Sequence, residues 1–350
     1  MNHLDISGDS FSAPTTSSGY NLPINQRWPH LVATELGIGT VDNRATNGDQ
    51  AADQSYKAQG VVRVADDLVA IFVGANDVRI YKDSATKRGY YERFLRRLIA
   101  DAVLPKRVKA RDVAMAKTGA WANTQVNPTG MYATALGASA KATVSGDVVY
   151  VGHIIQNAAA AQSTADVYID GVKAGTISCD GTGGMNTGNG LSYAPALARF
   201  PTTPGQHSVE VRVTSSGKNF YLDDIRGSDQ PETPLVLVSN LTKWGSAGYS
   251  TWGTTLAMIN SFNAVIGAVI ANYEADGFAV ELVDSYSVLD PATDLMADGL
   301  HPNAVGQRKI ADKFKETLQN YPRVESYPTA WGTTLTLTFV ENIVTQMVEV

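Results

Sequence analysis

An uninterrupted run of six apolar residues, Leu68 to Val73, constrains the fold more than any other stretch of the chain. A strand with alternating apolar and polar residues has one buried face, whereas a continuous apolar run of this length is typical of a strand buried on both faces. Such strands lie at the centre of parallel sheets whose two faces are covered by helices. The run therefore predicts an α/β fold built around a parallel sheet.

Segments before and after this run supply the other parts of such a fold. Helices are expected where apolar residues recur with helical spacing and where prolines or glycines mark the ends. These elements fall into two groups, 1–112 and 229–326, which we assign to one discontinuous α/β domain. We expect helices at 26–36, 91–103, 254–271 and 303–318, and further strands at 3–7, 41–44, 234–239 and 279–283.

The chain changes character between these two groups. From about residue 114, helical periodicity disappears, and short alternating segments are separated by turn sequences such as Ser145-Gly146-Asp147. That spacing is typical of an antiparallel β-sandwich, so we predict an inserted sandwich at 113–228. The stretch from Ala165 to Gly171 resembles a hairpin of carbohydrate-binding jelly-roll modules. The expected strands lie at 141–144, 148–155, 165–169, 208–213 and 220–225.

Two features of this insert bear on ligand binding. Trp121, Tyr132 and Tyr193 could stack on sugar rings, but packing in the core or at an edge is the preferred interpretation. The glycine-rich stretch 181–190 lacks the Lys-Ser/Thr of a P-loop and precedes no helix, which argues against a phosphate cradle. We expect a flexible loop there, near the mouth of the functional site.

Two short motifs near opposite ends of the chain carry the chemistry of a hydrolytic site. Ser10 follows the first expected strand, at the strand end where open α/β sheets bind ligands. A serine hydroxyl becomes a good nucleophile beside a base, and that base needs a third group to orient it. His301 and Asp298 lie three residues apart before a helix, so the carboxylate can reach the imidazole nitrogen that faces away from the serine. These motifs predict Ser10 as nucleophile, His301 as base and Asp298 as the orienting acid.

Two further blocks lie between these motifs, Asn47-Gly48 and Gly74-Ala75-Asn76-Asp77. The four blocks in this order resemble the GDSL, or SGNH, hydrolase family, over about residues 1–110 and 230–322. The resemblance implies a three-layer α/β/α fold, interrupted here by the jelly-roll-like sandwich, and ester hydrolysis through an acyl-enzyme without a metal or other cofactor. It also implies an oxyanion hole made by the backbone N–H groups of Ser10 and Gly48 and the side-chain amide of Asn76.

Several of these residues have structural alternatives. Gly48 could belong to an ordinary Asn-Gly turn, and Asn76 could cap a helix. Asp298 could cap the helix that follows it, which does not exclude the catalytic role. We expect Asp77 to brace its loop.

The substrate class is predicted from what surrounds the expected site, because the fold does not choose among esters. The inserted sandwich, the lack of an evident hydrophobic lid helix and the polar site loops favour removal of O-acetyl groups from a polysaccharide. A lipolytic esterase or thioesterase is one alternative. A glycan-binding adhesin with an inert hydrolase half is another, and intact Ser10, Asn76, Asp298 and His301 argue against it.

Composition and charge exclude several other classes. Lys and Arg number 28 and Asp and Glu 34, a net charge of −6 without a basic run, so nucleic acid is not an expected partner. The single cysteine, Cys179, allows neither an intramolecular disulfide nor a cysteine-based zinc site. Unbroken apolar runs do not reach 18 residues, so no membrane span is expected.

The two ends of the chain carry predictions about its setting. Met1 leads directly into the first expected strand without a signal peptide, so we expect a domain of a longer exported or virion-associated protein, with a cytoplasmic chain as the alternative. The tail 327–350 contains a strictly alternating segment, Thr334 to Phe339, that predicts a strand with one buried face. Because an unpaired strand edge favours pairing between subunits, we expect a homo-oligomer, and a trimer if the chain belongs to a viral fibre.

Overall fold

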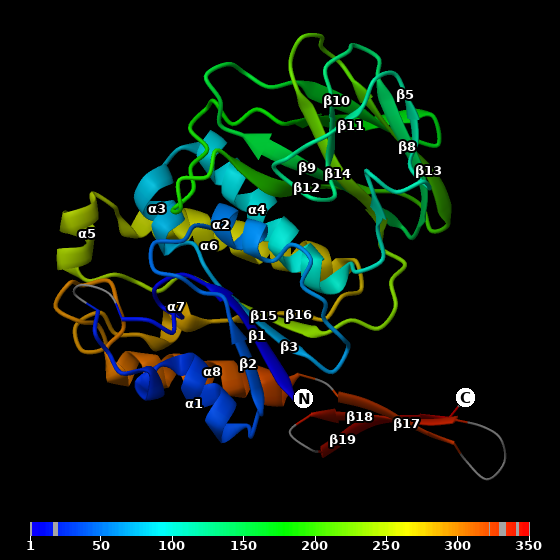
Figure 1. The fold of residues 1–350 in the computed structure, drawn as a ribbon. Helices are drawn as coiled ribbons and strands as arrows, with labels where there is room; N and C mark the ends of the chain where they lie inside the picture. Colours follow the sequence, from blue (N-terminus) through cyan, green and yellow to red (C-terminus); the bar gives the residue numbers. More distant parts are fainter. Residues whose placement is uncertain (1, 17–19, 322, 329–333, 341–342, 350) are drawn as a thin grey trace.

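The structure, a computed structural model, describes residues 2–16, 20–321, 323–328, 334–340 and 343–349. Its central element is a five-stranded parallel sheet in the order β16-β15-β3-β1-β2 (Figure 1). Strand β3 (Leu68–Phe72) lies in the middle with all five residues buried, as the apolar run predicted. The other strands are β1 (His3–Gly8), β2 (Thr40–Asn43), β15 (Leu235–Ser239) and β16 (Val280–Val283).

Helices cover both faces of this sheet and confirm the α/β class. Figure 1 places α1 (Trp28–Glu35) and α8 (Ala304–Asn320) on one face, and α4 (Ala85–Val103) and α6 (Leu256–Ala275) on the other. These four correspond to the four helices expected from the sequence, with shifted ends. Shorter elements that the sequence did not predict are η1 (Ile24–Gln26), α2 (Ala51–Lys57), α3 (Ala75–Tyr81), α5 (Ser246–Trp252) and α7 (Ser285–Val288).

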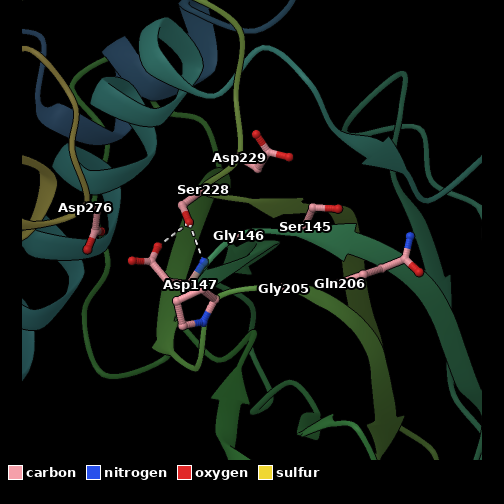
Figure 2. Close-up of a pocket in the computed structure, with 9 residues that line it drawn as sticks. Ser145, Gly146, Asp147, Gly205, Gln206, Ser228, Asp229 and Asp276 are labelled. Carbon is pink, nitrogen blue, oxygen red and sulfur yellow. Dashed lines mark hydrogen bonds between the residues drawn. The ribbon is translucent and has the colours of Figure 1, made fainter. Parts of the chain in front are cut away.

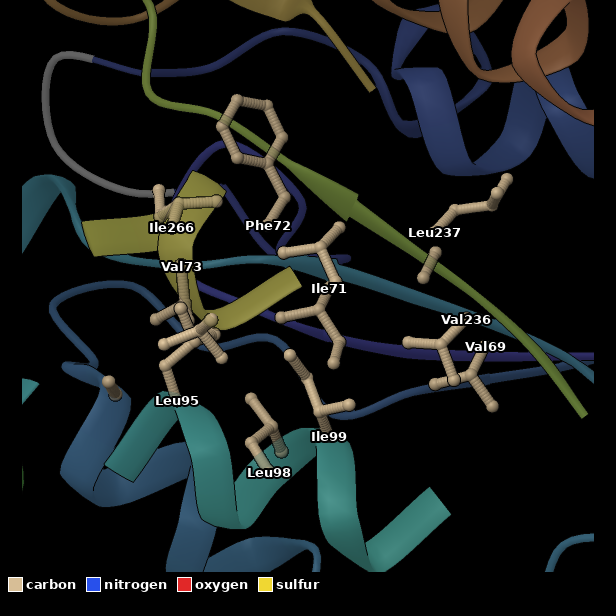
Figure 3. Close-up of a cluster of buried hydrophobic side chains, with 14 of the residues drawn as sticks. Val69, Ile71, Phe72, Val73, Leu95, Leu98, Ile99, Val236, Leu237 and Ile266 are labelled. Atoms are coloured by element: carbon tan, nitrogen blue, oxygen red, sulfur yellow. The ribbon is translucent and has the colours of Figure 1, made fainter. Parts of the chain in front are cut away.

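The packing of β3 shows why the central strand is apolar throughout. Figure 3 shows Leu95 and Ile99 of α4 lying against the side of the sheet to which Ile71 points. Phe72 points to the other side, because successive side chains of a strand alternate, and its ring meets that of Phe11 at a centroid distance of 5.4 Å. Full burial of one such side chain contributes about 1.5–3 kcal/mol, so a strand that buries both faces is stabilised most at the sheet centre.

Residues between α4 and β15 form two antiparallel sheets, which we call the insert sheets. One has the order β11-β10-β13-β8-β5 and the other β12-β9-β14-β7-β6, with β4 paired to β14. Side chains of both sheets meet in a second hydrophobic cluster that includes Val151, Val167 and Val211. The five strands predicted here are confirmed, and six others were not predicted. The strands are β4 (Val108–Lys109), β5 (Ala116–Thr118), β6 (Ala122–Asn123), β7 (Met131–Ala133), β8 (Ser139–Ser145), β9 (Val148–Gln156), β10 (Thr164–Ile169), β11 (Val172–Ser178), β12 (Tyr193–Pro201), β13 (Gln206–Val213) and β14 (Phe220–Gly227).

The three aromatic residues considered as sugar platforms take part in packing. Trp121 and Tyr132 are partly buried against the second hydrophobic cluster, and Tyr132 contacts the ring of Tyr221 at 5.9 Å between centroids. Tyr193 meets the ring of Tyr56 of α2 edge-on at 5.7 Å. These contacts agree with the preferred interpretation of packing and place an insert strand beside α2.

An ion network fixes the insert sheets on α4. Arg97 of α4 reaches Asp223 and Asp224 of β14, with N–O distances of 2.8 and 3.3 Å. Arg226 of β14 reaches back to Asp101 of α4, with 2.7 Å between Nη2 and Oδ1. Burial alone would raise the pKa of Asp224, but Arg226 and Arg97 outweigh it and lower that pKa. We call these five buried residues the anchor cluster.

The C-terminal segment forms a small sheet of its own. Strands β17 (Arg323–Pro328), β18 (Thr334–Val340) and β19 (Ile343–Glu349) pair in antiparallel fashion, and β18 confirms the strand predicted from alternation. Figure 1 shows this sheet following α8, on the side of the parallel sheet away from the insert sheets. The burial of one face of β18 lies outside the described side chains, so pairing between subunits stays a prediction.

By length and composition, α6 is the one helix of the described residues that could cross a membrane. The sequence predicts no membrane span when only unbroken apolar runs are counted. Helix α6 has no such run, but its many small and apolar residues, interspersed with Asn and Ser, give it a high mean hydropathy. In the fold α6 covers the parallel sheet, and Phe262, Ile266 and Ile270 are buried there. Core helices often pass the same test, so α6 alone is a weak indication of a span.

Candidate active site

Ser10 lies in the tight turn that leaves β1. That turn approaches β3 so closely that a Cβ added at Gly8 would lie 2.8 Å from the carbonyl oxygen of Phe72. The Oγ of Ser10 lies 2.8 Å from Nε2 of His301, a residue 291 positions away in the sequence. The structure thus brings together the nucleophile and the base that the sequence predicted.

The other ring nitrogen of His301 contacts Asp298. Nδ1 lies 2.6 Å from Asp298 Oδ2, and Asp298 Oδ1 accepts the backbone N–H groups of Leu300 and His301 at 2.9 and 3.0 Å. Burial raises the pKa of Asp298, but these hydrogen bonds outweigh it and leave the pKa below its ordinary value. The ionised carboxylate holds the proton on Nδ1, which leaves Nε2 to accept the proton of Ser10. The cap of α8 is Asn303, not Asp298.

Two aromatic rings hold the imidazole in this orientation. Tyr20 stacks on His301 with 4.5 Å between ring centroids, and Phe11 meets its edge at 5.7 Å. Gln307 of α8 donates its amide to the Tyr20 hydroxyl at 2.6 Å and to the Phe11 carbonyl at 3.1 Å. The sequence did not predict Tyr20 or Gln307, because no local motif marks two residues that meet across 287 positions.

Two backbone N–H groups near the serine are available to bind a negative charge. Gly48 lies in an exposed turn with a φ of +87°, a conformation that favours glycine. The N–H of Thr46 donates to the Gly8 carbonyl at 3.3 Å, which places this turn beside the turn of the nucleophile. In the described part of the chain, neither the Gly48 N–H nor the Ser10 N–H has a hydrogen-bond acceptor.

The side-chain amide of Asn76 is held at both ends. Its Nδ2 donates to the Asp49 carbonyl and its Oδ1 accepts from Arg79 Nη1, both at 2.9 Å. Because the amide nitrogen carries two protons, one N–H remains for a substrate oxygen. Helix α3 begins after Gly74 without a side-chain cap, so Asn76 is not the cap that the sequence allowed. Arg79, which also lies 3.7 Å above the Trp252 ring, was not predicted.

Two buried carboxyl groups connect the loops around the serine. Asp9 Oδ2 accepts the N–H groups of Gly74 and Ala75, each at 3.3 Å, and so ties the turn of the nucleophile to the end of β3. Asp77 Oδ2 accepts the Ala51 N–H at 3.0 Å, in agreement with the predicted bracing role. Burial raises the pKa of Asp9 to about 6 and that of Asp77 to about 8.

A cavity of about 510 Å³ lies apart from these residues, between loops of the insert sheets and the C-terminal end of α6. Figure 2 shows Asp147 and Ser228 on its wall, where the Ser228 hydroxyl donates to the Asp147 carboxylate at 2.6 Å. Ser10 and His301 do not line this cavity, so it plays no part in their chemistry. Among the residues that the structure describes, no group of three or more His, Cys, Asp or Glu side chains could hold a metal ion.

The arrangement is suited to acyl transfer. A hydroxyl, an imidazole and an ionised carboxylate are hydrogen-bonded in series, and free N–H donors lie on turns tied to that of the serine. Such a set can deprotonate a hydroxyl as it attacks an ester carbonyl, and can bind the oxyanion that forms.

Comparison with known proteins matches the chain to two family models. One, the GDSL-like Lipase/Acylhydrolase family, matches residues 6–172, and the other, GDSL-like Lipase/Acylhydrolase, matches residues 221–314. The first match contains Ser10, Gly48 and Asn76, and the second contains Asp298 and His301.

A curated relative and two solved structures are also similar to the chain. A multidomain esterase of Ruminococcus flavefaciens is 30% identical over 107 residues, which are 31% of this chain and only 13% of that protein. A carbohydrate acetylesterase family member from Sinorhizobium meliloti shares 11% identity over 91% of this chain and 98% of its own, with a TM-score of 0.44. A lipolytic G-D-S-L family member from Veillonella parvula DSM 2008 shares 11% identity over 90% and 96%, with a TM-score of 0.42.

Proposed function

Because the chain belongs to the GDSL-like lipase/acylhydrolase family, also called SGNH hydrolases, we propose that it is a serine esterase whose catalytic triad is Ser10, His301 and Asp298. The observation that carries the proposal is the unbroken series of hydrogen bonds, 2.8 Å from Ser10 to His301 and 2.6 Å from His301 to Asp298. The similarity to a multidomain esterase supports the same class of reaction.

The first half of the reaction forms an acyl-enzyme. Ser10 Oγ attacks the ester carbonyl while His301 Nε2 takes its proton, and Asp298 stabilises the resulting imidazolium. The oxyanion of the tetrahedral intermediate is bound by the Ser10 and Gly48 N–H groups and the Asn76 amide. Each such donor is worth about 3–4 kcal/mol, because it acts on a charge that exists only near the transition state. Collapse of the intermediate breaks the ester C–O bond, and the departing alcohol takes the proton from His301.

The second half releases the acid. Water attacks the acyl carbonyl, His301 takes its proton, and the same donors bind the second oxyanion. The proton then returns from His301 to Ser10 Oγ as the carboxylic acid leaves. The first and last proton transfers, from Ser10 to His301 and back, run between two atoms that the structure holds 2.8 Å apart.

For the substrate, we propose O-acetyl groups on a polysaccharide. The insert sheets support a glycan partner if residues 113–228 form a jelly-roll-like module set into a hydrolase domain of 1–112 and 229–326. The loop 181–190, rich in Gly, Asn and Thr, lies against the turn that holds Gly48, which favours a polar substrate over a long acyl chain. The chain would act on such a substrate outside the cell or as part of a virion. The homo-oligomer stays a prediction.

Release of acetate from acetylated polysaccharides tests the proposal. The wild type should release acetate, and Ser10→Ala should retain its fold with less than about a thousandth of the activity. Residual activity above that level would reject Ser10 as the nucleophile.

A chain-length series of p-nitrophenyl esters tests the acyl group. Preference for acetate supports a deacetylase, whereas preference for octanoate or longer esters would replace it with a lipolytic esterase. Glycan binding without turnover of any ester would contradict the enzyme and indicate an adhesin.

A further inference from the structure

We propose that Asn189, in the loop 181–190 of the insert sheets, is a positioning residue for the oxyanion hole, acting through the side chain of Asp49. The inference rests on the proposed function, because it concerns the donors that Gly48 and Asn76 would offer to the oxyanion. It means that the α/β part of the chain does not complete its active site alone.

The loop 181–190 reaches the site through direct contacts. Asn189 donates its side-chain amide to Asp49 Oδ1 at 2.9 Å. Asp53 of α2 accepts the backbone N–H groups of Gly188 and Asn189, at 2.6 and 3.1 Å. A Cβ added at Gly188 would clash with the carbonyl oxygen of Gly48, so the two turns touch through their backbones. The stretch that the sequence marked as a flexible loop is thus held against the turn of the oxyanion hole.

Asp49 connects this loop to the Asn76 amide and, through Gln54, to the turn of the nucleophile. Its carboxylate is fully buried and also accepts from Gln54 and Lys57, while its backbone carbonyl accepts the Asn76 amide at 2.9 Å. Gln54 in turn accepts the Gly8 N–H at 3.2 Å, next to the turn of the nucleophile. A shift of Asp49 would therefore move the Gly48 N–H and the Asn76 amide relative to Ser10.

The chemistry at Asp49 explains why the donor at position 189 matters. Burial raises the pKa of Asp49, although Lys57 and Gln54 oppose that effect, so its carboxylate depends on each hydrogen bond it receives. Without the Asn189 amide, Asp49 Oδ1 would lose its hydrogen-bond donor and would face the space that the amide vacates. Oxyanion donors act only over short distances, and a displacement of about 1 Å can reduce a rate by about a hundredfold.

Three substitutions in the loop test the inference on p-nitrophenyl acetate. Asn189→Ala removes the donor and should lower kcat by about tenfold, with KM changed less than about twofold. Asn189→Asp is almost the same size but places an acceptor against Asp49, so kcat should fall further. Asn186→Ala is the matched control, because only backbone groups of Asn186 contact Tyr81, and it should keep the wild-type kcat.

The ranking of kcat and KM among these variants distinguishes a positioning role of Asn189 from simple space filling. If Asn189 only fills space, Asn189→Asp should behave like the wild type and Asn189→Ala should change KM as much as kcat. Either outcome overturns the inference while the esterase assignment stands.

Hydrogen exchange of the peptide that contains residues 44–50 makes the test independent of turnover. Asn189→Ala should speed exchange there and Asn186→Ala should not, whichever reaction the site catalyses. Unchanged exchange in Asn189→Ala would contradict the inference. Failure of the wild type to cleave any ester would contradict the proposed function instead.

Discussion

Two groups of buried aspartates in this molecule differ in what surrounds them. At the site, Asp9 and Asp77 accept backbone N–H groups and have no ion-pair partner among the described residues, and burial raises their pKa to about 6 and about 8. In the anchor cluster, Asp101 and Asp224 are just as buried, but neighbouring arginines outweigh that burial and lower the pKa of both.

The difference separates two uses of a buried carboxyl group. Paired carboxylates in the anchor cluster hold two parts of the fold together, and removal of one partner leaves an uncompensated charge. Carboxyl groups at the site organise backbone turns, but burial opposes their ionisation. Substitutions in the anchor cluster should therefore change stability, and substitutions at the oxyanion hole should change the rate.

Arg226→Met should have the largest effect on stability. It removes one of the three guanidinium groups that contact both Asp101 and Asp224, and leaves one buried negative charge uncompensated. The free energy of unfolding should therefore fall by about 3–5 kcal/mol. Urea denaturation measures this loss, and kcat of the folded fraction should stay within about twofold of the wild type.

Arg88→Met is the matched control for the anchor cluster. Arg88 pairs with Asp83, whose side chain is 74% exposed, so the loss should stay below about 1 kcal/mol. Equal destabilisation by Arg226→Met and Arg88→Met would contradict the role of the anchor cluster.

Asn76→Ala should have the opposite profile. It removes one oxyanion donor, so kcat should fall by about 10²–10³ while KM changes little. The lost hydrogen bonds to the Asp49 carbonyl and Arg79 should lower the free energy of unfolding by about 1–3 kcal/mol, less than in Arg226→Met. Steady-state kinetics and urea denaturation of the same preparation measure the rate and the stability side by side. An unchanged kcat would remove Asn76 from the oxyanion hole.

Asp77→Asn should show its effect as a change in the pH dependence of stability. The folded pKa of about 8 lies above the ordinary value of 3.8, so between these values the folded state holds a proton that the unfolded chain releases. Stability should therefore fall as pH rises, and between about pH 6.5 and 8 the wild type should lose about 2 kcal/mol more than Asp77→Asn. Parallel stability curves for the two proteins would show that Asp77 does not titrate in this window.

Residues whose roles depend on local spacing could be predicted from the sequence. Asp298 and His301 lie three positions apart before a helix, and Ser10 follows directly on a strand, so each has a neighbour that marks it. The structure brings these three side chains into contact. Tyr20 and Gln307 have no such mark, because their contact depends on how α8 packs beside the turn of the nucleophile.

The insert sheets show the same difference between features that a local pattern marks and features that arise only in the fold. Strands such as β10 and β13 alternate between buried and partly exposed residues and were predicted. Strand β12 was missed because it contains two prolines and a run of four buried residues instead of an alternating pattern. The anchor cluster was not predicted either, since its charged residues on α4 and β14 are far apart in the sequence and meet only in the fold.

Covalent labelling with a fluorophosphonate tests most directly that Ser10 is a nucleophile activated by His301. Peptide mass analysis should find one adduct on the peptide that contains Ser10. The adduct should be absent in Ser10→Ala and should form far more slowly in His301→Ala. An adduct on another residue, or an equal rate of labelling in His301→Ala, would contradict the triad.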